Sequence, residues 1–406
     1  MLRRCFSSLF NLGSKKNVVS IILIGNPLVW YYTVLSVLSS LDSTKTNVVV
    51  LVVHFSALIL SALAGAKFGK QMERPKFLIL WMIIGAVSSP TLFAVGNTSV
   101  ILASLVSLFL GISLGFGMPS CMSYFSDSVA IESRGRISGI TMLASGIGIA
   151  AFGAAPVNDL FLLGIVLGVW RLSSLLVFLW DRDYRRTERK ESQPSYKQVI
   201  SQHSFALYFV PWVMFSLVNY LAAPIAPNNE VTPGLEIVQT VFMGASAVFG
   251  GIFMDSIGRK RMAITGFTML GVAAALLGFS GSSLPKIPAP ILYFNAVVDG
   301  IAWGLLLVLF ILTLWGDLSQ SFSSDKYYAL GVTPFFLSKF LELIVTPYIP
   351  PSITTSTPLV SFTAFFLFLA VLPLVYAPET LPEKVMKEHA LKTYVDKAQE
   401  IAQKYY

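Results

Sequence analysis

The sequence predicts an all-helical integral membrane protein with twelve transmembrane segments arranged as two matched groups of six. Hydrophobic residues make up 55% of the 406-residue chain and charged residues only 12%, whereas soluble domains carry about 25% charged residues. The mean hydropathy is +0.71, and several uncharged apolar runs exceed the roughly 18 residues of a membrane-spanning helix. These runs lack the alternating pattern of membrane barrel strands. Because unpaired backbone groups are costly in hydrocarbon, we expect each run to be a helix.

The predicted spans follow one another along the chain, and each is close to the about 20 residues that a tilted helix needs to cross a bilayer. The separation between the fifth and sixth is the least marked, since only Pro156 and Asp159 interrupt the apolar run. The first run is long enough to span, so we interpret it as an uncleaved first helix. The twelve spans are 17–41, 47–69, 77–95, 98–125, 137–156, 160–180, 204–226, 235–254, 263–281, 290–315, 329–349 and 357–377.

The placement of lysine and arginine supports this count and predicts the orientation. With both termini cytoplasmic, 25 of the 29 basic residues fall in cytoplasmic segments; the exceptions are Lys45, Lys286, Arg171 and Lys339. One helix too many or too few would invert every later loop and remove this asymmetry. The net charge of +8 therefore marks the orientation of a multi-pass protein in the plasma or inner membrane, and no nucleic-acid partner is expected.

The two groups of spans repeat at a nearly constant interval. Spans one and seven begin 187 residues apart, at 17 and 204, and the loops that open at Gly65 and Gly251 lie 186 residues apart. Asp127 and Asp317, which end spans four and ten, are separated by 190 residues. Such a period is the mark of a duplicated fold. The predicted domains are a cytoplasmic segment 1–16, six-helix bundles 17–180 and 204–377, a cytoplasmic loop 181–203 and a cytoplasmic helical tail 378–406.

Enzymatic motifs do not occur in the sequence. The two cysteines, Cys5 and Cys121, suggest neither a disulfide framework nor a metal site. There is no HExxH motif, nucleophile elbow or phosphate-binding loop, and the three histidines are scattered at positions 54, 203 and 389. We therefore expect no catalytic residues, no metal and no cofactor.

A glycine-rich basic loop between spans eight and nine has a specific spacing. It reads Gly251-Ile-Phe-Met-Asp255-Ser-Ile-Gly258-Arg259-Lys260-Arg261. Glycines permit a tight turn and close helix approach, and an aspartate can accept hydrogen bonds from the backbone at a helix start. The spacing resembles the loop signature of the major facilitator superfamily. The resemblance covers the whole architecture and about three loops, including Arg134–Arg136 and Pro378-Glu379-Thr380.

The resemblance implies that this loop is part of a cytoplasmic latch that breaks when a transporter opens inward. Asp255 would then face the start of span five near Arg136, and Arg259 would pair with Asp317 or Asp325. In the symmetric loop of the first half, Gly69 replaces the expected acid, so we expect an asymmetric latch that is stronger in the second half. The glutamine-rich signature of sugar carriers is absent from span seven, which leaves the branch of the family open.

Ionisable residues within spans are costly and usually face a cavity or a partner. Helix rise places His54, Asp299 and Glu342 at a similar depth on the outer side. We consider that they form a protonatable, ion-coupling cluster with Lys339 as a charge partner; the alternative is a static ion pair between Lys339 and Glu342, with His54 in a packing role. Arg171 lies in a span that the resemblance makes peripheral, which favours a structural role; the alternative is a misplaced helix boundary.

In the resembling family, spans one, four, seven and ten line a central cavity. Polar and aromatic residues on these spans are therefore substrate candidates, because they suit organic solutes through stacking and hydrogen bonding. Each could instead be a packing residue. The candidates, with Asp299, are Asn26, Trp30, Tyr31, Ser120, Trp212, Asn219, Tyr220, Asn295 and Trp303.

These features together predict a secondary active transporter that moves a small organic solute by alternating access. Coupling to protons or to another ion is open. The alternatives are a facilitative uniporter and a receptor or scramblase of the same fold that does not transport. The expected partners are the solute, a coupling ion and membrane lipid, and a monomer is expected.

Overall fold

The computed structural model describes residues 15–40, 44–95, 99–155, 159–180, 192–222, 233–283, 288–320, 322–345 and 357–382, together with Lys387 and Leu391. Parts of the predicted segments 1–16, 181–203 and 378–406 lie outside these residues. Every regular element in the described part of the chain is helical, as the composition predicts.

The first half of the chain forms seven α-helices and two short 3-10 helices, η1 (Gly69–Gln71) and η2 (Ser89–Val95). The predicted span 98–125 is divided in two by a turn at Phe116 and Gly117, because Pro119 starts the second helix and cannot continue the first. The α-helices are α2 (Lys15–Ser39), α3 (Thr44–Phe68), α4 (Arg74–Ser88), α5 (Val100–Gly115), α6 (Met118–Ser128), α7 (Arg134–Ala154) and α8 (Leu160–Trp180).

The second half repeats this plan after a short helix, α9 (Tyr196–Ile200). The predicted span 290–315 is a continuous rod made of α13 (Ala289–Leu307), the π-helical segment η5 (Val308–Thr313) and α14 (Leu314–Leu318). The last span is broken at Ala370, ahead of Pro373. The other helices are α10 (His203–Ala222), α11 (Pro233–Ile257), α12 (Arg259–Ser283), α15 (Asp325–Val345), α17 (Thr357–Leu369) and α18 (Val371–Tyr376).

Each of the twelve predicted spans overlaps helical structure in the described part of the chain, but they do not all have the character of a membrane span. Within the described residues, nine helical segments are long and apolar enough to cross a membrane. The apolar parts described for α10 and for α17–α18 are shorter, and α15 contains Lys339 and Glu342. The protein is therefore a multi-pass membrane protein, and the count of twelve stays a prediction.

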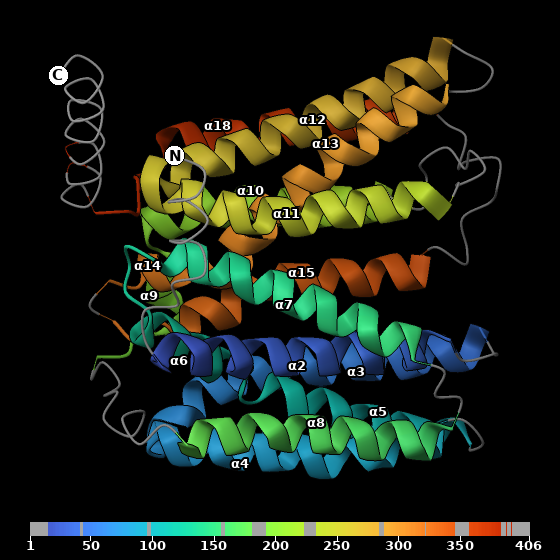
Figure 1. The fold of residues 1–406 in the computed structure, drawn as a ribbon, viewed down its shortest axis with the longest axis vertical. Helices are drawn as coiled ribbons and strands as arrows, with labels where there is room; N and C mark the ends of the chain where they lie inside the picture. Colours follow the sequence, from blue (N-terminus) through green and yellow to red (C-terminus); the bar gives the residue numbers. More distant parts are fainter. Residues whose placement is uncertain are drawn as a thin grey trace, which may run out of the picture.

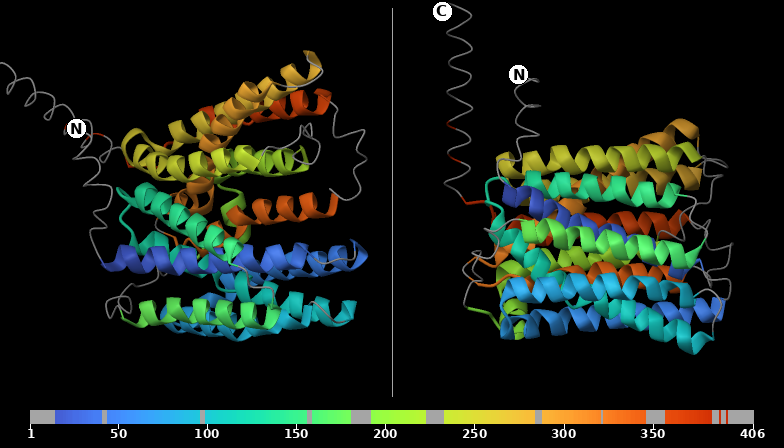
Figure 2. Two further views of the ribbon diagram at one scale, coloured as in Figure 1. Left: turned by 45° about the vertical axis from the view of Figure 1, so that its right-hand side comes forward. Right: turned by 60° about the horizontal axis from the view of Figure 1, so that its bottom comes forward.

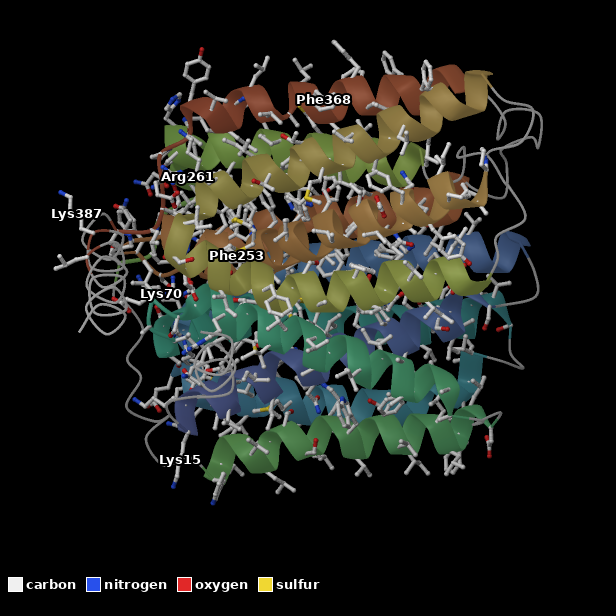
Figure 3. All side chains as sticks on the ribbon, turned by 45° about the horizontal axis from the view of Figure 1, so that its top comes forward. Lys15, Lys70, Phe253, Arg261, Phe368 and Lys387 are labelled. Carbon is white, nitrogen blue, oxygen red and sulfur yellow. The ribbon has the colours of Figure 1, made fainter. Side chains whose placement is uncertain are left out.

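The helices of each half pack mainly on one another (Figure 1). Their axes are roughly aligned with one another, as the two further views show (Figure 2). The halves are joined mainly by α7 with α11 and by α3 with α15, and α6 with α15 and α7 with η5 add further contacts. Lys15, Lys70, Arg261 and Lys387 lie at the same end of the bundle (Figure 3). We call this end, where α6 meets α7 and α11 meets α12, the latch end, and the opposite one the far end.

Candidate functional site

Asp317 is the centre of an ion-pair network at the latch end. Its carboxylate accepts from Arg259 Nε at 2.9 Å and also from Arg134 Nη1, so it joins the end of α14 to the starts of α12 and α7. All three side chains are buried. The remaining guanidinium nitrogens are used as well: Arg259 donates to the carbonyl oxygens of Met254 and Ile131. Asp317 and Asp325 were the two partners expected for Arg259, and the structure pairs it with Asp317.

Asp255 fastens the end of α11 to the start of α7. Its two carboxylate oxygens accept from the backbone N–H groups of Gly135 and Arg136, each at 2.8 Å. Negative charge is stabilised at a helix N-terminus by the unpaired N–H groups and the helix dipole. The helices approach very closely here, because a Cβ atom on Gly251 would lie 2.2 Å from the carbonyl oxygen of Gly135. This close approach explains the glycine that begins the motif.

The turn between α11 and α12 is held by the segment that follows α18. Gly258 has a φ of +113°, which disfavours any residue with a side chain. Directly after it, Glu379 accepts from the N–H groups of Arg259 at 2.8 Å and Lys260 at 3.1 Å. Lys260 Nζ also donates to the carbonyl oxygen of Val375, whereas Arg261 is exposed. The Pro378-Glu379-Thr380 fragment is therefore the N-terminal cap of α12.

The first half has its own version of this network, which corrects the expected asymmetry in part. Arg74 Nη1 pairs with Asp127 at 2.8 Å, matching the pair of Arg259 with Asp317. Gly69 indeed leaves no acid in the loop, but Asp325 at the start of α15 occupies the region instead. It lies 3.9 Å from Arg74 Nη2 and accepts from the Ser120 hydroxyl at 2.5 Å. Both halves thus contribute a buried ion pair to the latch end.

The described part of the central loop also contacts the latch end. Lys326 of α15 donates to the carbonyl oxygen of Pro194 at 2.9 Å and lies over the ring of Tyr196. The Tyr196 hydroxyl donates to the carbonyl oxygen of Leu63 on α3. Burial, followed by the negative charge of Asp325, raises the pKa of Tyr196 above its usual value, so this hydroxyl stays a donor.

A cavity of about 1320 Å³ lies between the two halves, beyond the latch. Its walls come from α2, α6, α7, α11, α12, α13, η5, α15 and α17. On the latch side α7 and α11 touch as far as Leu143 and Gly244, and then they diverge: a Cβ atom on Gly146 or Gly153 would meet no heavy atom within 4 Å. Figure 1 shows this divergence of α7 from α11. The cavity is therefore closed at the latch end and lies where the halves separate.

Asp299 is the acidic group of the α13 wall. Asn295, Asp299 and Trp303 follow one another at intervals of four residues, and all three line the cavity, as side chains on one helix face do. Gln239 of α11 donates to the Asp299 carboxylate at 2.5 Å. Among the described residues, no lysine or arginine forms an ion pair with it.

Glu342 provides a second carboxylate on the opposite wall, and it is paired. Lys339 donates to it at 2.8 Å within α15, and both side chains are partly exposed. This arrangement corresponds to the static ion pair and not to a pairing of Lys339 with Asp299. Tyr31 and Tyr32 of α2 line the same cavity, and the Tyr31 ring packs edge-on against Phe336 at 5.5 Å.

His54 does not join the expected cluster. It is fully buried between α3 and α5, and its Nδ1 lies 3.1 Å from the carbonyl oxygen of Ser107. It is not among the cavity-lining residues. Similar depth in the membrane did not bring His54 to Asp299 and Glu342, because its side chain is turned toward α5. Its packing role is the alternative that the geometry supports.

Four substrate candidates lie in helix interfaces and not on the cavity wall. Asn26 donates to the Trp170 carbonyl oxygen of α8, and Trp30 Nε1 donates to the Ser89 hydroxyl at 2.7 Å. Ser120 belongs to the latch network described above. Trp212 is fully buried, where it donates to the Gly331 carbonyl oxygen and stacks on Phe310 at 4.7 Å. No described residue of α10, the seventh predicted span, lines the cavity, and the side chains of Asn219 and Tyr220 lie outside the described residues.

Arg171 lies deep among the helices of the first half. It is 1% exposed, and its guanidinium carbon is 4.4 Å from the ring centre of Trp81 and 5.7 Å from that of Trp30. None of its three side-chain nitrogens has a hydrogen-bond partner among the described residues. Helix α8 has the bounds predicted for the sixth span, so the helix boundary was not misplaced. The rings of Trp81 and Trp30 contact the guanidinium group.

Several wall residues have no feature in the sequence that marks them as lining a cavity. Gln239 is a single amide in an apolar helix, and its interest lies only in being opposite Asp299. Tyr32, Phe335 and Phe336 were indistinguishable from packing residues. The methionines of the wall (Met118, Met122, Met142 and Met243) were equally indistinct.

No protein-family model matches the sequence, and no curated protein matches it at the sequence level. Solved structures do match the fold. The proton:xylose symporter XylE bound to 6-bromo-6-deoxy-D-glucose matches with a TM-score of 0.68 at 13% identity, over 91% of this chain and 97% of that one. The human organic anion transporter MFSD10 matches with a TM-score of 0.60 at 14% identity, over 89% of this chain and 99% of that one. Together with the loop signature, these likenesses show that the chain has the fold of the major facilitator superfamily.

Proposed function

We propose that this protein is a secondary active transporter that moves a small organic solute by alternating access. The observation that carries the proposal is the cavity between the two halves, closed at one end by buried contacts that join them: the ion pair of Arg134 with Asp317 and the hydrogen bond from Gly135 N–H to Asp255. A cavity of this size accommodates an organic solute. Because the closing contacts are between the halves, they can break without unfolding either one.

We propose that the latch end is cytoplasmic. Lys15, Lys70, Arg261 and Lys387 lie there, and cytoplasmic loops are enriched in basic residues. The described state would then face outward. Labelling of a cysteine introduced at exposed Lys70 by an impermeant maleimide in intact cells and in permeabilised cells tests this orientation. Labelling in intact cells would contradict it.

Transport is tested by counterflow. Purified protein is first screened for thermal stabilisation against a library of metabolites and drugs, and each stabilising solute is then loaded into liposomes containing the protein. Exchange of labelled for unlabelled solute supports a carrier. Stabilisation without exchange would indicate a receptor, and exchange that no ion gradient can drive uphill would indicate a uniporter.

We propose Asp299 as the coupling group if the driving ion is the proton. It lines the cavity with an amide as its described partner, whereas Glu342 is paired with Lys339 and His54 lies outside the cavity. Carboxyl groups within membrane spans are common proton carriers in transporters. Asp299→Asn is therefore expected to abolish uptake driven by a pH gradient, while counterflow at saturating solute continues.

The control for this prediction is Glu236→Gln, which removes an exposed carboxylate of α11 that does not line the cavity. It should leave both activities unchanged. Uptake by Asp299→Asn that still follows the pH gradient would rule out coupling through this residue.

A further inference from the structure

The charge of the cavity wall is unbalanced. Asp299 and Glu342 are its charged lining residues, and no described lysine or arginine lines it. Glu342 is neutralised by Lys339 at 2.8 Å, whereas the described hydrogen bond to Asp299 comes from an uncharged amide. One negative charge therefore faces the cavity. A carboxylate in a largely apolar site is stabilised by a cation in contact with it.

The polar groups of the wall are few, and several are already engaged. The Ser145 hydroxyl donates to the Thr141 carbonyl oxygen, Asn295 donates to the Ala273 carbonyl oxygen, and Gln239 donates to Asp299. A sugar or another polyol has many hydroxyl groups and would replace only some of its hydrogen bonds to water, and unmade hydrogen bonds are costly when buried. An organic anion would meet Asp299 without a basic partner. The wall thus disfavours both classes.

Aromatic rings complete the site around the acid. Trp303 lies one helical turn from Asp299 on the same face of α13, and Tyr31, Tyr32, Phe335 and Phe336 form the wall contributed by α2 and α15. The faces of such rings attract cations, with Trp the strongest. Four methionines add polarizable surface that adapts to different shapes. Apart from the few polar groups, the remaining wall is mainly aliphatic.

We infer that the solute of this cavity is an organic monocation with an aromatic or aliphatic body, such as a protonated or quaternary amine, whose charge pairs with Asp299. This assignment rests on the proposed function, since it treats the cavity as the solute site. It differs in class from what the sugar symporter and the organic anion transporter of the same fold are named for.

The test measures binding of three probes of similar shape to the purified full chain by isothermal titration calorimetry. They are the cation 1-methyl-4-phenylpyridinium, neutral 4-phenylpyridine in alkaline buffer and the anion biphenyl-4-carboxylate, with D-xylose as a polyol. We expect the cation to bind on the order of tenfold or more tightly than 4-phenylpyridine, because only the cation gains the contact with the carboxylate. The anion and the sugar should not bind measurably.

Variants of Asp299 test whether its carboxylate is the group that pairs with the cation. Asp299→Asn should weaken binding of the cation about tenfold or more and leave that of 4-phenylpyridine unchanged, which also shows that the variant is folded. Asp299→Glu should keep the preference for the cation, and the control Glu236→Gln should behave as the parent protein. Absence of cation binding, equal affinity for 4-phenylpyridine, or full cation affinity in Asp299→Asn would each overturn the assignment.

Counterflow of the same probes separates this inference from the proposed function. Exchange of another solute without binding of the cation would defeat the solute class and leave the transporter standing. Binding of the cation through Asp299 without exchange would defeat transport and leave the solute class standing.

Discussion

At the scale of single residues, Arg171 carries a charge into the interior of the first half without a hydrogen-bond partner among the described residues. Removing a guanidinium from water costs several kcal/mol even after relaxation. The contacts with the rings of Trp81 and Trp30 return about 2 kcal/mol. The balance indicates that this residue lowers stability and is tolerated because the aromatic rings partly compensate it.

Arg171→Met is therefore expected to stabilise the protein. Methionine keeps the length of the side chain and removes the desolvated charge, and exchanges of buried charges for apolar residues have stabilised proteins by about 1–4 kcal/mol. The measurement is the thermal unfolding midpoint followed by tryptophan fluorescence in detergent. Arg171→Lys is the matched variant: it keeps the charge, loses the planar contact and should unfold at a lower temperature. A lower midpoint for Arg171→Met would show that the charge has a partner.

At the scale of secondary-structure elements, the contact between α7 and α11 depends on small residues facing each other. A Cβ atom on Gly251 would lie 2.2 Å from the Gly135 carbonyl oxygen, and one on Gly139 would lie 2.2 Å from that of Ala247. For Gly251 the three nearest atoms belong to α7, across the interface. This position therefore governs how the halves meet more than how α11 packs within its own half.

Gly251→Val is expected to prevent closure of the latch end while leaving both halves folded. The added side chain would separate the backbones and lengthen the hydrogen bonds from Gly135 and Arg136 to Asp255. A cysteine introduced at Ser138, which is fully buried here, should then react with a soluble maleimide at least several times faster. Gly153→Val on α7 is the control, because a Cβ atom there meets nothing within 4 Å. Equal labelling in the two variants would contradict the prediction.

At the scale of the whole molecule, the sequence predicted the helical class and the order of the described helices well and the orientation of their faces poorly. Hydropathy is a local property, so each apolar run gave a helix near its predicted bounds. Which face of a helix meets the cavity depends on its rotation. A membrane helix is apolar toward lipid and toward its neighbours, so no periodicity encodes that rotation. Trp30 and Trp212 were predicted to line the cavity because they lie in spans one and seven, and both are buried in helix interfaces.

The latch was more predictable than the cavity for a physical reason. Buried charged residues need a partner of opposite charge. The resemblance of the loop motif implied Asp317 or Asp325 as the partner of Arg259, and the structure has Asp317. The role of Glu379 as the cap of α12, and the contacts of Asp325 with Ser120 and Arg74, required the tertiary arrangement. The cavity depends on packing among residues of common types, such as Gln239 opposite Asp299, and a single sequence does not reveal such a pair.

The network around Asp317 predicts how the whole molecule responds when the latch is weakened. Asp317→Asn leaves the buried guanidinium groups of Arg134 and Arg259 without their shared carboxylate. Breaking a buried pair in this way costs about 3–5 kcal/mol, which changes the ratio of two conformations by a factor on the order of 10² to 10³. Because a state open at the latch end exposes these groups to water, the cost falls on the described state, and the population should move toward opening at that end.

Spin-label distances at both ends test this response. One pair at Lys70 and Arg261 reports on the latch end, and a second at Val100 and Ala289 on the far end; all four residues are exposed. In Asp317→Asn the first distance should lengthen and the second should shorten, since alternating access opens one end as it closes the other. Glu132→Gln removes an exposed carboxylate beside α7 and should change neither. If both distances lengthened together, the two halves would be separating from each other, and this result would contradict alternating access.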